Sequence, residues 1–199
     1  MLDRMNDITR IRTLCVFCGS SEGKGLLYRQ AATQLAHAMA EKGISLVYGG
    51  GGRGLMGLMA SNLHGKVPRV TGVIPEKLYA MVKEIPHYED ELVIVKDMHG
   101  RKAMMYQLSD AFLALPGGVG TLEELMEAFT WLHLGYQCKP VGILNSHGYY
   151  DHLLTFLEHT VEEGFLKQEF LNSLVVEEDP RLLLQRLEST PLELPGKLV

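Results

Sequence analysis

The 199-residue chain has 46% apolar and 22% charged residues, the composition of an ordinary globular protein with one core. Its formal net charge of −5 argues mildly against a nucleic-acid binder, because such proteins usually carry a basic excess. No apolar run approaches the roughly 20 residues that a membrane helix needs, and the N-terminal MLDRMNDITRIR lacks the apolar stretch of a secretory signal. We therefore expect a cytoplasmic protein with neither a membrane nor a nucleic-acid partner.

Short apolar runs alternate with longer amphipathic ones along the chain. The predicted strands span residues 12–19, 44–50, 69–75, 91–98, 111–116, 140–145 and 173–179. The predicted helices span residues 26–42, 54–65, 100–110, 121–134, 149–163 and 180–189. Residues 76–91 have no clear period and are predicted to form a loop with room for one helical turn.

This alternation predicts βαβ units, and nearly continuous apolar strands are typical of a parallel sheet covered on both faces. We expect an α/β fold, a Rossmann-like doubly wound parallel sheet of about seven strands in a single domain over residues 1–199. Residues 1–11 and 190–199 are predicted to be tails.

Two of the three cysteines form a CxxC within a predicted strand. Cys15 and Cys18 should point to opposite faces, because their separation along a strand is odd. A redox CxxC would instead sit at a helix start. We interpret both as buried small apolar residues, and expect no metal.

Three glycine-bearing turns each stand between a strand and a helix. They are CGSSEGKG (18–25), YGGGGRGLMG (48–57) and PGGVGT (116–121). Ligands of open α/β sheets bind at the carboxyl ends of strands, and helix N-termini there offer free N–H groups to an anion. Glycines also simply turn a chain, but three clusters at corresponding places favour a phosphate-bearing ligand.

A dinucleotide site is an alternative interpretation of the second turn. Gly52, Gly54 and Gly57 fit G-x-G-x-x-G, but the ribose-binding acid expected near the end of the next strand has only Glu76 as a candidate. An oxidoreductase using NAD(P) would also need a substrate domain, for which the chain leaves little room.

The third turn carries candidate catalytic residues. Thr121 and Glu124 fit the T-x-x-E capping box, a purely structural motif. That interpretation leaves the three glycines and Glu123 unexplained. A phosphate held by this turn would place its sugar near a carboxylate, which can activate water or stabilise an oxocarbenium-like transition state.

Two cations are predicted in the first turn of the helix at 100–110, where the helix dipole disfavours them. Arg101 and Lys102 could be solvated surface charges, or they could bind phosphate and stabilise a leaving group.

Taken together, PGGVGTLEE, VFCGSS, YGGGGRGLMG, GVIP and DMHGRK resemble, in order and spacing, the motifs of the LOG family, the cytokinin riboside 5′-monophosphate phosphoribohydrolases long labelled "lysine decarboxylases". The resemblance covers roughly residues 12–180. It implies a Rossmann-like homodimeric hydrolase that cleaves the N-glycosidic bond of a cytokinin riboside 5′-monophosphate or AMP, giving a free base and ribose 5-phosphate. It implies no cofactor; pyridoxal phosphate needs a Schiff-base lysine, and no lysine stands in a setting that suggests one.

Carried over by motif position, Arg101 and Glu124 would be the catalytic pair. Glu84 matches a family acid that contacts substrate, although the loop around it departs in length from the family pattern. The residues that would line the nucleotide pocket are Gly19, Ser20, Lys102, Gly117, Gly118, Gly120, Thr121 and Glu123.

Two further expectations concern apolar residues. The segment 125–136 is apolar almost all round, which favours burial in a homodimer. An apolar pocket for an N6-prenyl group could draw on Met56, Met59, Met98 or Met105, although methionines more often fill cores. A nucleotide-binding sensor without turnover remains the rival to the hydrolase.

Overall fold

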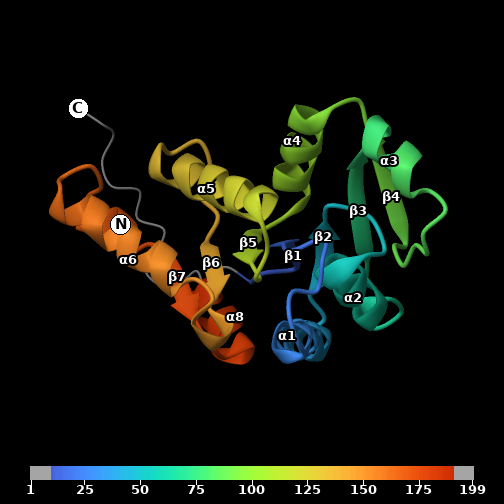
Figure 1. The fold of residues 1–199 in the computed structure, drawn as a ribbon, viewed down its shortest axis with the longest axis horizontal. Helices are drawn as coiled ribbons and strands as arrows, with labels where there is room; N and C mark the ends of the chain where they lie inside the picture. The colour runs from blue at the N-terminus through green and yellow to red at the C-terminus, as the bar shows by residue number, and fades with distance from the viewer. Residues whose placement is uncertain (1–9, 191–199) are drawn as a thin grey trace, which may run out of the picture.

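A seven-stranded parallel β-sheet forms the centre of the molecule, as predicted (Figure 1). The computed structural model describes residues 10–190. The strands are β1 Thr13–Phe17, β2 Ser45–Tyr48, β3 Val70–Pro75, β4 Glu91–Val95, β5 Ala111–Ala114, β6 Val141–Leu144 and β7 Leu174–Glu177. Their spatial order is β4-β3-β2-β1-β5-β6-β7.

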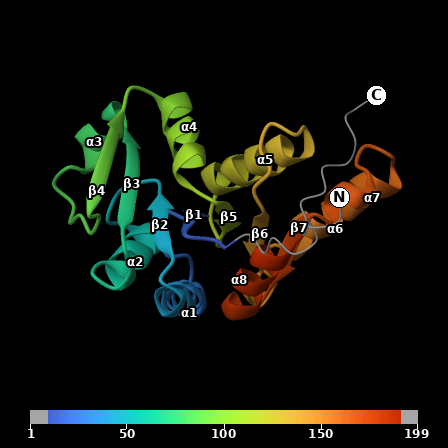
Figure 2. The same cartoon turned by 180° about the vertical axis from the view of Figure 1, so that it is seen from behind.

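Helices cover both faces of the sheet (Figures 1 and 2). They are α1 Leu27–Lys42, α2 Gly54–Leu63, α3 Glu76–Val82, α4 Met98–Leu108, α5 Val119–His133, a 3₁₀ turn η1 Ser146–Gly148, α6 Asp151–Glu162, α7 Gln168–Leu171 and α8 Pro180–Ser189. Apolar residues of α1, α2 and α8 form one core cluster with the sheet. Those of α4, α5 and α6 form a second cluster on the opposite face.

Cys15 in β1 and Cys18, one residue past the end of β1, belong to different core clusters, as expected from their spacing. Cys15 packs with the α4–α5 cluster, and Cys18 packs with the α1–α2 cluster. Both are buried, and burial raises the pKa of both thiols. The thiols are therefore protonated, apolar fillers of the core.

The strand order reverses direction at the centre of the sheet. The chain builds outward from β1 to β4, then returns to place β5 on the other side of β1. The ends of these central strands are aligned, since Phe17 pairs with Ala114. Such a switch point opens a crevice at the carboxyl ends of the strands.

Several element boundaries differ from the sequence prediction. The 76–91 segment contains α3, two helical turns where one was expected. The chain after β6 begins with η1 and adds α7, neither of which was predicted. Ile11, assigned to a tail, is 2% exposed and belongs to the core cluster that includes apolar residues of α1. The rest of both predicted tails, apart from Arg10 and Thr190, lies outside the described residues.

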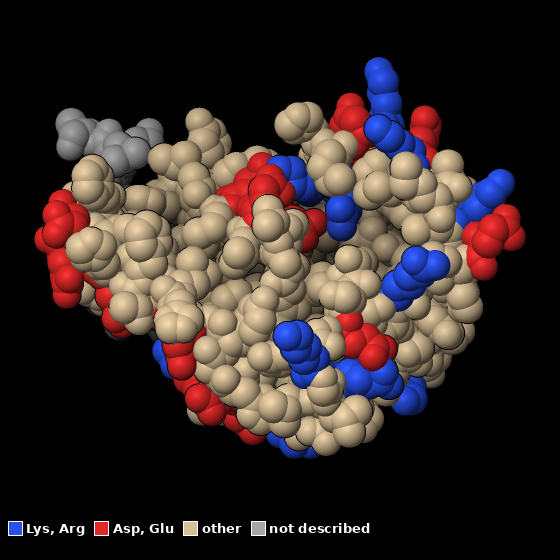
Figure 3. Space-filling model, viewed as in Figure 1, with Lys and Arg blue, Asp and Glu red and all other residues tan. Residues whose placement is uncertain are grey.

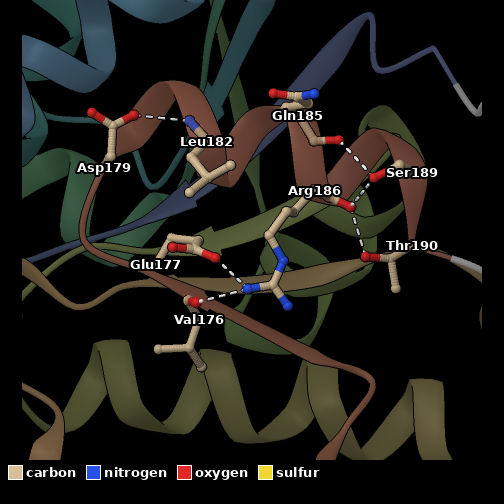
Figure 4. Close-up of polar contacts among 8 residues, drawn as sticks. All are labelled: Val176, Glu177, Asp179, Leu182, Gln185, Arg186, Ser189 and Thr190. Atoms are coloured by element: carbon tan, nitrogen blue, oxygen red, sulfur yellow. Dashed lines mark hydrogen bonds and ion pairs between the residues drawn. The ribbon is translucent and has the colours of Figure 1, made fainter.

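The last helix is fastened to the neighbouring edge strand, as Figure 4 shows. Asp179 caps α8 by accepting a hydrogen bond from the backbone N–H of Leu182 at 2.9 Å, and Pro180 opens the helix as expected. Arg186 pairs with Glu177 and donates to the carbonyl of Val176 at 3.4 Å. These contacts hold α8 against the end of β7.

Charges of both signs lie interspersed on the face drawn in Figure 3, with no continuous basic surface there. No helix within residues 10–190 has the length and apolar character needed to span a bilayer.

Candidate active site

A cavity of about 550 Å³ opens at the carboxyl ends of the central strands. Its lining comes from the turns after β1, β2 and β5, from the end of β3, from α2, α3 and α4, and from the first two turns of α5. The residues are Cys18, Gly19, Ser20, Gly49, Gly50, Gly51, Gly52, Arg53, Met56, Ile74, Leu78, Val82, Ile85, Arg101, Gly118, Val119, Gly120, Thr121 and Glu124. The three glycine turns of the sequence thus meet at one cavity, at the switch point.

Backbone hydrogen bonds tie the three turns together. The N–H of Gly19 donates to the carbonyl of Pro116 at 3.1 Å, and the carbonyl of Gly19 accepts from the N–H of Leu55 at 3.0 Å. Gly57 is explained by packing, since a Cβ there would lie 2.2 Å from the carbonyl oxygen of Gly52. The G-x-G-x-x-G spacing therefore allows the close contact between α2 and the turn that precedes it. Glu76, the candidate ribose-binding acid of a dinucleotide site, is exposed at the start of α3.

Arg101 and Glu124 meet at the cavity wall. Arg101 Nη2 lies 3.2 Å from Glu124 Oε1, and the two side chains are only 13% and 10% exposed. Gly49 leaves room for the arginine, because a Cβ at this position would lie 1.9 Å from Arg101 Nη2. Helices α4 and α5, which carry separate motifs of the chain, thus place a cation and a carboxylate together.

The surroundings of this ion pair affect the hydrogen bonding of Arg101 and the pKa of Glu124. Arg101 Nε is buried without a hydrogen-bond partner among the described residues, an exception among buried polar groups. Burial raises the pKa of Glu124, an effect opposed by the Arg101 guanidinium and reinforced by Glu123. A carboxyl group whose pKa is raised in a cavity is suited to accept a proton from water.

The helix α5 begins earlier than predicted, and the capping-box interpretation is wrong. Its N-cap is Gly118 and its first residue is Val119, so Thr121 is the third helical residue. Thr121 is instead buried against the turn, where a Cβ on Gly117 would lie 2.1 Å from its Oγ1. Glu124 consequently has no capping role, and α5 has no side-chain cap.

The helix α4 also begins two residues before its predicted start, at Met98. Asp97 caps it by accepting from the N–H of Gly100 at 2.9 Å. Arg101 and Lys102 are therefore the fourth and fifth helical residues, beyond the first turn in which they were predicted.

Lys102 joins two carboxylates of α5. Its Nζ lies 2.5 Å from Glu123 Oε1 and 2.9 Å from Glu127 Oε1. Lys102 is 8% exposed. Burial alone would lower its pKa, but the two carboxylates outweigh burial and raise it. Lys102 is thus a fixed cation that links α4 to α5.

The predicted site residues divide into two groups. Gly19, Ser20, Gly118, Gly120 and Thr121 line the cavity together with the catalytic candidates. Four predicted pocket residues do not line it: Lys102 and Glu123, which pair with each other, the exposed Glu84, and Gly117. Gly117 lines a smaller neighbouring cavity of about 200 Å³.

The apolar wall of the cavity was largely missed by the sequence analysis. Ile74, Leu78, Val82 and Ile85 form it with Met56. The spacing of Leu78 and Val82, one helical turn apart, was the available signal. Of the other methionines considered, Met59 and Met105 are buried in the cores, and the sulfur of exposed Met98 accepts from Arg101 at 3.4 Å.

The fold and this cavity define a Rossmann-like α/β protein with a glycine-lined, partly apolar cavity at the switch point. Solved structures share the fold. The molybdenum cofactor binding protein of Rippkaea orientalis has a TM-score of 0.66 and 20% identity, covering 91% of this chain and 98% of its own. The Chlamydomonas reinhardtii molybdenum cofactor carrier protein has a TM-score of 0.65 and 17% identity, with the same coverage. These likenesses concern the fold alone.

Relatives found by sequence comparison identify the family as well as the fold. The family model described as "Possible lysine decarboxylase" matches residues 56–187. The cytokinin riboside 5′-monophosphate phosphoribohydrolase LOG2 of Arabidopsis thaliana is 48% identical over 181 residues, 90% of this chain and 84% of the relative. The probable phosphoribohydrolase LOGL3 of rice (Oryza sativa subsp. japonica) is 49% identical over 181 residues, 90% and 85% of the two chains. The chain belongs to the LOG family, as its motifs indicated.

Proposed function

We propose that this protein hydrolyses the N-glycosidic bond of adenosine-type nucleoside 5′-monophosphates, including AMP and N6-prenylated cytokinin riboside monophosphates. The products are the free base and ribose 5-phosphate. The observation that carries the proposal is the Arg101–Glu124 pair, 3.2 Å apart beside the uncapped N-terminus of α5 in the same cavity. The names of the 48–49% identical relatives support the same substrate class.

The start of α5 supplies the phosphate site. The first intrahelical bond on this helix is donated by the N–H of Leu122 to Gly118 at 3.1 Å, so the preceding N–H groups have no partner in the part of the chain that the structure describes. A Cβ added to Gly118 or Gly120 would meet no neighbouring atom within 4 Å, so the backbone there is open to a ligand. The positive end of the helix dipole adds to the attraction for a dianion.

The base lies against the apolar wall formed by α3 and Met56. A purine face and an N6-prenyl group are both apolar, and Leu78, Val82 and Ile85 present apolar surface in the same cavity. The phosphate at α5 and the base at α3 then place the ribose between them, beside Glu124.

The reaction breaks the bond between C1′ of the ribose and the base nitrogen while water adds to C1′. The carboxylate of Glu124 stabilises the oxocarbenium-like carbon and accepts a proton from the attacking water. The guanidinium of Arg101 orients that carboxylate and stabilises the charge that develops on the departing base. The base leaves with the bonding electron pair and takes up a proton from solvent, which balances the proton that Glu124 accepts from the attacking water and later returns to solvent.

The test compares AMP with adenosine, and N6-isopentenyl-AMP with its nucleoside, by chromatographic detection of free base. The phosphate site supplies binding energy that positions the sugar, so the monophosphates should be cleaved far faster. Equal rates with and without phosphate would refute the phosphate site. Binding of AMP with no base released would favour the rival interpretation, a nucleotide sensor.

We further propose that the protein is a homodimer. Large apolar side chains are exposed at both ends of α5: Val119 is 82% exposed, Leu134 46% and Tyr136 78%. A symmetric contact is a common way to cover such surface. Light scattering at micromolar concentration should give twice the chain mass of 22.2 kDa, and a mass of one chain would contradict the dimer.

A further inference from the structure

A tyrosine outside the main cavity touches the glycine turn that leads into α5. The hydroxyl of Tyr149 donates to the carbonyl of Gly117 at 2.6 Å. Its ring meets Tyr28 edge-on at 5.4 Å and Tyr150 at 4.9 Å between centroids. Tyr149, Gly117 and Gly118 all line the smaller cavity of about 200 Å³, whereas only Gly118 of the three also lines the larger one.

The turn after β6 is built to present this tyrosine. The side chain of Asn145 accepts from the N–H of Tyr150 at 2.8 Å and donates to Asp151 at 2.7 Å. His147 adopts a left-handed conformation with φ of 55°, which is uncommon outside glycine and allows the tight turn. After Gly148 come Tyr149 and then Tyr150, which is the N-cap of α6.

Every carbonyl along the turn into α5 has a donor. Tyr150 Oη donates to Leu115 at 2.7 Å, Gly19 N donates to Pro116 at 3.1 Å, and Tyr149 Oη donates to Gly117. Because a trans peptide is planar, the N–H of Gly118 points opposite to the carbonyl of Gly117. The Tyr149 bond therefore fixes that N–H so that it points away from the Tyr149 hydroxyl, and the N–H has no partner within residues 10–190.

We propose that Tyr149 is a positioning residue for the substrate phosphate, because its hydroxyl fixes the Gly117–Gly118 peptide with the N–H of Gly118 directed into the larger cavity. Two adjacent glycines leave this peptide free to rotate once the hydroxyl is lost. The inference rests on the proposed phosphate site at α5, but not on catalysis by Glu124.

Tyr150 provides a matched control at the next position. Its hydroxyl also donates to a carbonyl of the same turn, that of Leu115. The peptide that follows Leu115 carries no N–H, because residue 116 is proline. Tyr150→Phe therefore removes an equivalent hydrogen bond without releasing any donor toward the phosphate.

The experiment measures the dissociation constants of AMP and adenosine by calorimetry for the wild type, Tyr149→Phe and Tyr150→Phe. Tyr149→Phe should weaken AMP about 10- to 100-fold, the effect of one misdirected hydrogen bond to a charged group, and leave adenosine unchanged. KM for AMP should rise more than kcat falls. Tyr150→Phe should change neither affinity.

A second readout is independent of activity. In protein labelled with ¹⁵N-glycine, inorganic phosphate should shift the Gly118 amide resonance of the wild type and of Tyr150→Phe, but not that of Tyr149→Phe. Unchanged AMP affinity in Tyr149→Phe, equal losses for AMP and adenosine, or a wild type that binds both equally would overturn the inference. If the wild type binds AMP through its phosphate but releases no base, the proposed function fails while the Tyr149 result still decides the inference.

Discussion

Replacing Glu124 by glutamine separates a chemical role from a structural one. The substitution keeps the size of the side chain and an amide oxygen that can accept from Arg101, 3.2 Å away. It removes the negative charge and the ability to take a proton. Because the N-cap of α5 is Gly118, no capping bond is lost. The expected result is a folded protein that binds AMP and has lost most of its turnover.

The magnitude of the loss follows from the role. General-base action alone contributes about 100- to 10,000-fold, which corresponds to about 2.7–5.5 kcal/mol of transition-state stabilisation. Stabilisation of an oxocarbenium-like carbon adds to this. The loss in kcat should therefore be at least about 100-fold.

Stability should change little or improve at neutral pH. Burial, the largest influence on Glu124, raises its pKa above the usual value, so the ionised form is disfavoured in the folded chain relative to the unfolded one. At a pH below the pKa that Glu124 has in the unfolded chain, the carboxyl is protonated in both states and does not destabilise the fold. As the pH rises through the raised pKa of the folded state, burial of the ionised carboxylate lowers the free energy of unfolding. A neutral glutamine avoids that loss, so the variant should melt no lower than the wild type at pH 7.

The assay combines three measurements: base release from AMP, AMP affinity by calorimetry, and thermal melting. Glu123→Gln is the control on the same helix turn, because Glu123 is 53% exposed and pairs with Lys102 outside the cavity lining. It should retain most activity. Wild-type turnover by Glu124→Gln would refute the reasoning and direct the search for the catalytic carboxylate to Glu123.

Three other outcomes are expected. Gly49→Ala should fold but lose turnover, because the new methyl group would lie 1.9 Å from Arg101 Nη2 and displace that flexible side chain; normal activity would show that the arginine position is unimportant. The methyl group of Gly120→Ala would meet no protein atom within 4 Å, and the melting temperature should stay the same or rise slightly, since alanine favours helix by about 0.5–1 kcal/mol. The same methyl group should lower the affinity for AMP. Unchanged AMP affinity would place the phosphate elsewhere. The rate should fall as pH drops through the raised pKa of Glu124, so kcat/KM should have an acid limb above the ordinary value of 4.5; the same limb in Glu124→Gln would assign it to another group.

The fold was largely predictable from the sequence because parallel strands and amphipathic helices leave strong periodic signals. The strand count, the central location of the glycine turns and the opposite facing of Cys15 and Cys18 all follow from local patterns. Local patterns failed where a helix start depends on tertiary contacts. Thr121 looked like a cap, but its side chain is held against the backbone of Gly117, a contact that only the folded turn creates.

The sequence motifs predicted which residues form the candidate site, but not which side chains those residues contact. The meeting of Arg101 with Glu124 requires α4 and α5 to be placed by the sheet, and no spacing in the chain encodes their distance. Lys102 could not be assigned from sequence, since a cation beside a phosphate and a cation between Glu123 and Glu127 leave the same pattern. The contribution of Tyr149 depends on the turn after β6 reaching the turn after β5.

The most direct test of the central claim is the stoichiometry of products formed from AMP and from N6-isopentenyl-AMP. Purified protein is incubated with each nucleotide, and the base and the sugar phosphate are quantified in parallel, with Glu124→Gln as the matched control. Cleavage at the glycosidic bond predicts equal amounts of free base and ribose 5-phosphate from the wild type, and at most about 1% of that rate from the variant. Release of inorganic phosphate and nucleoside instead, or no product at all from a protein that binds AMP, would contradict it.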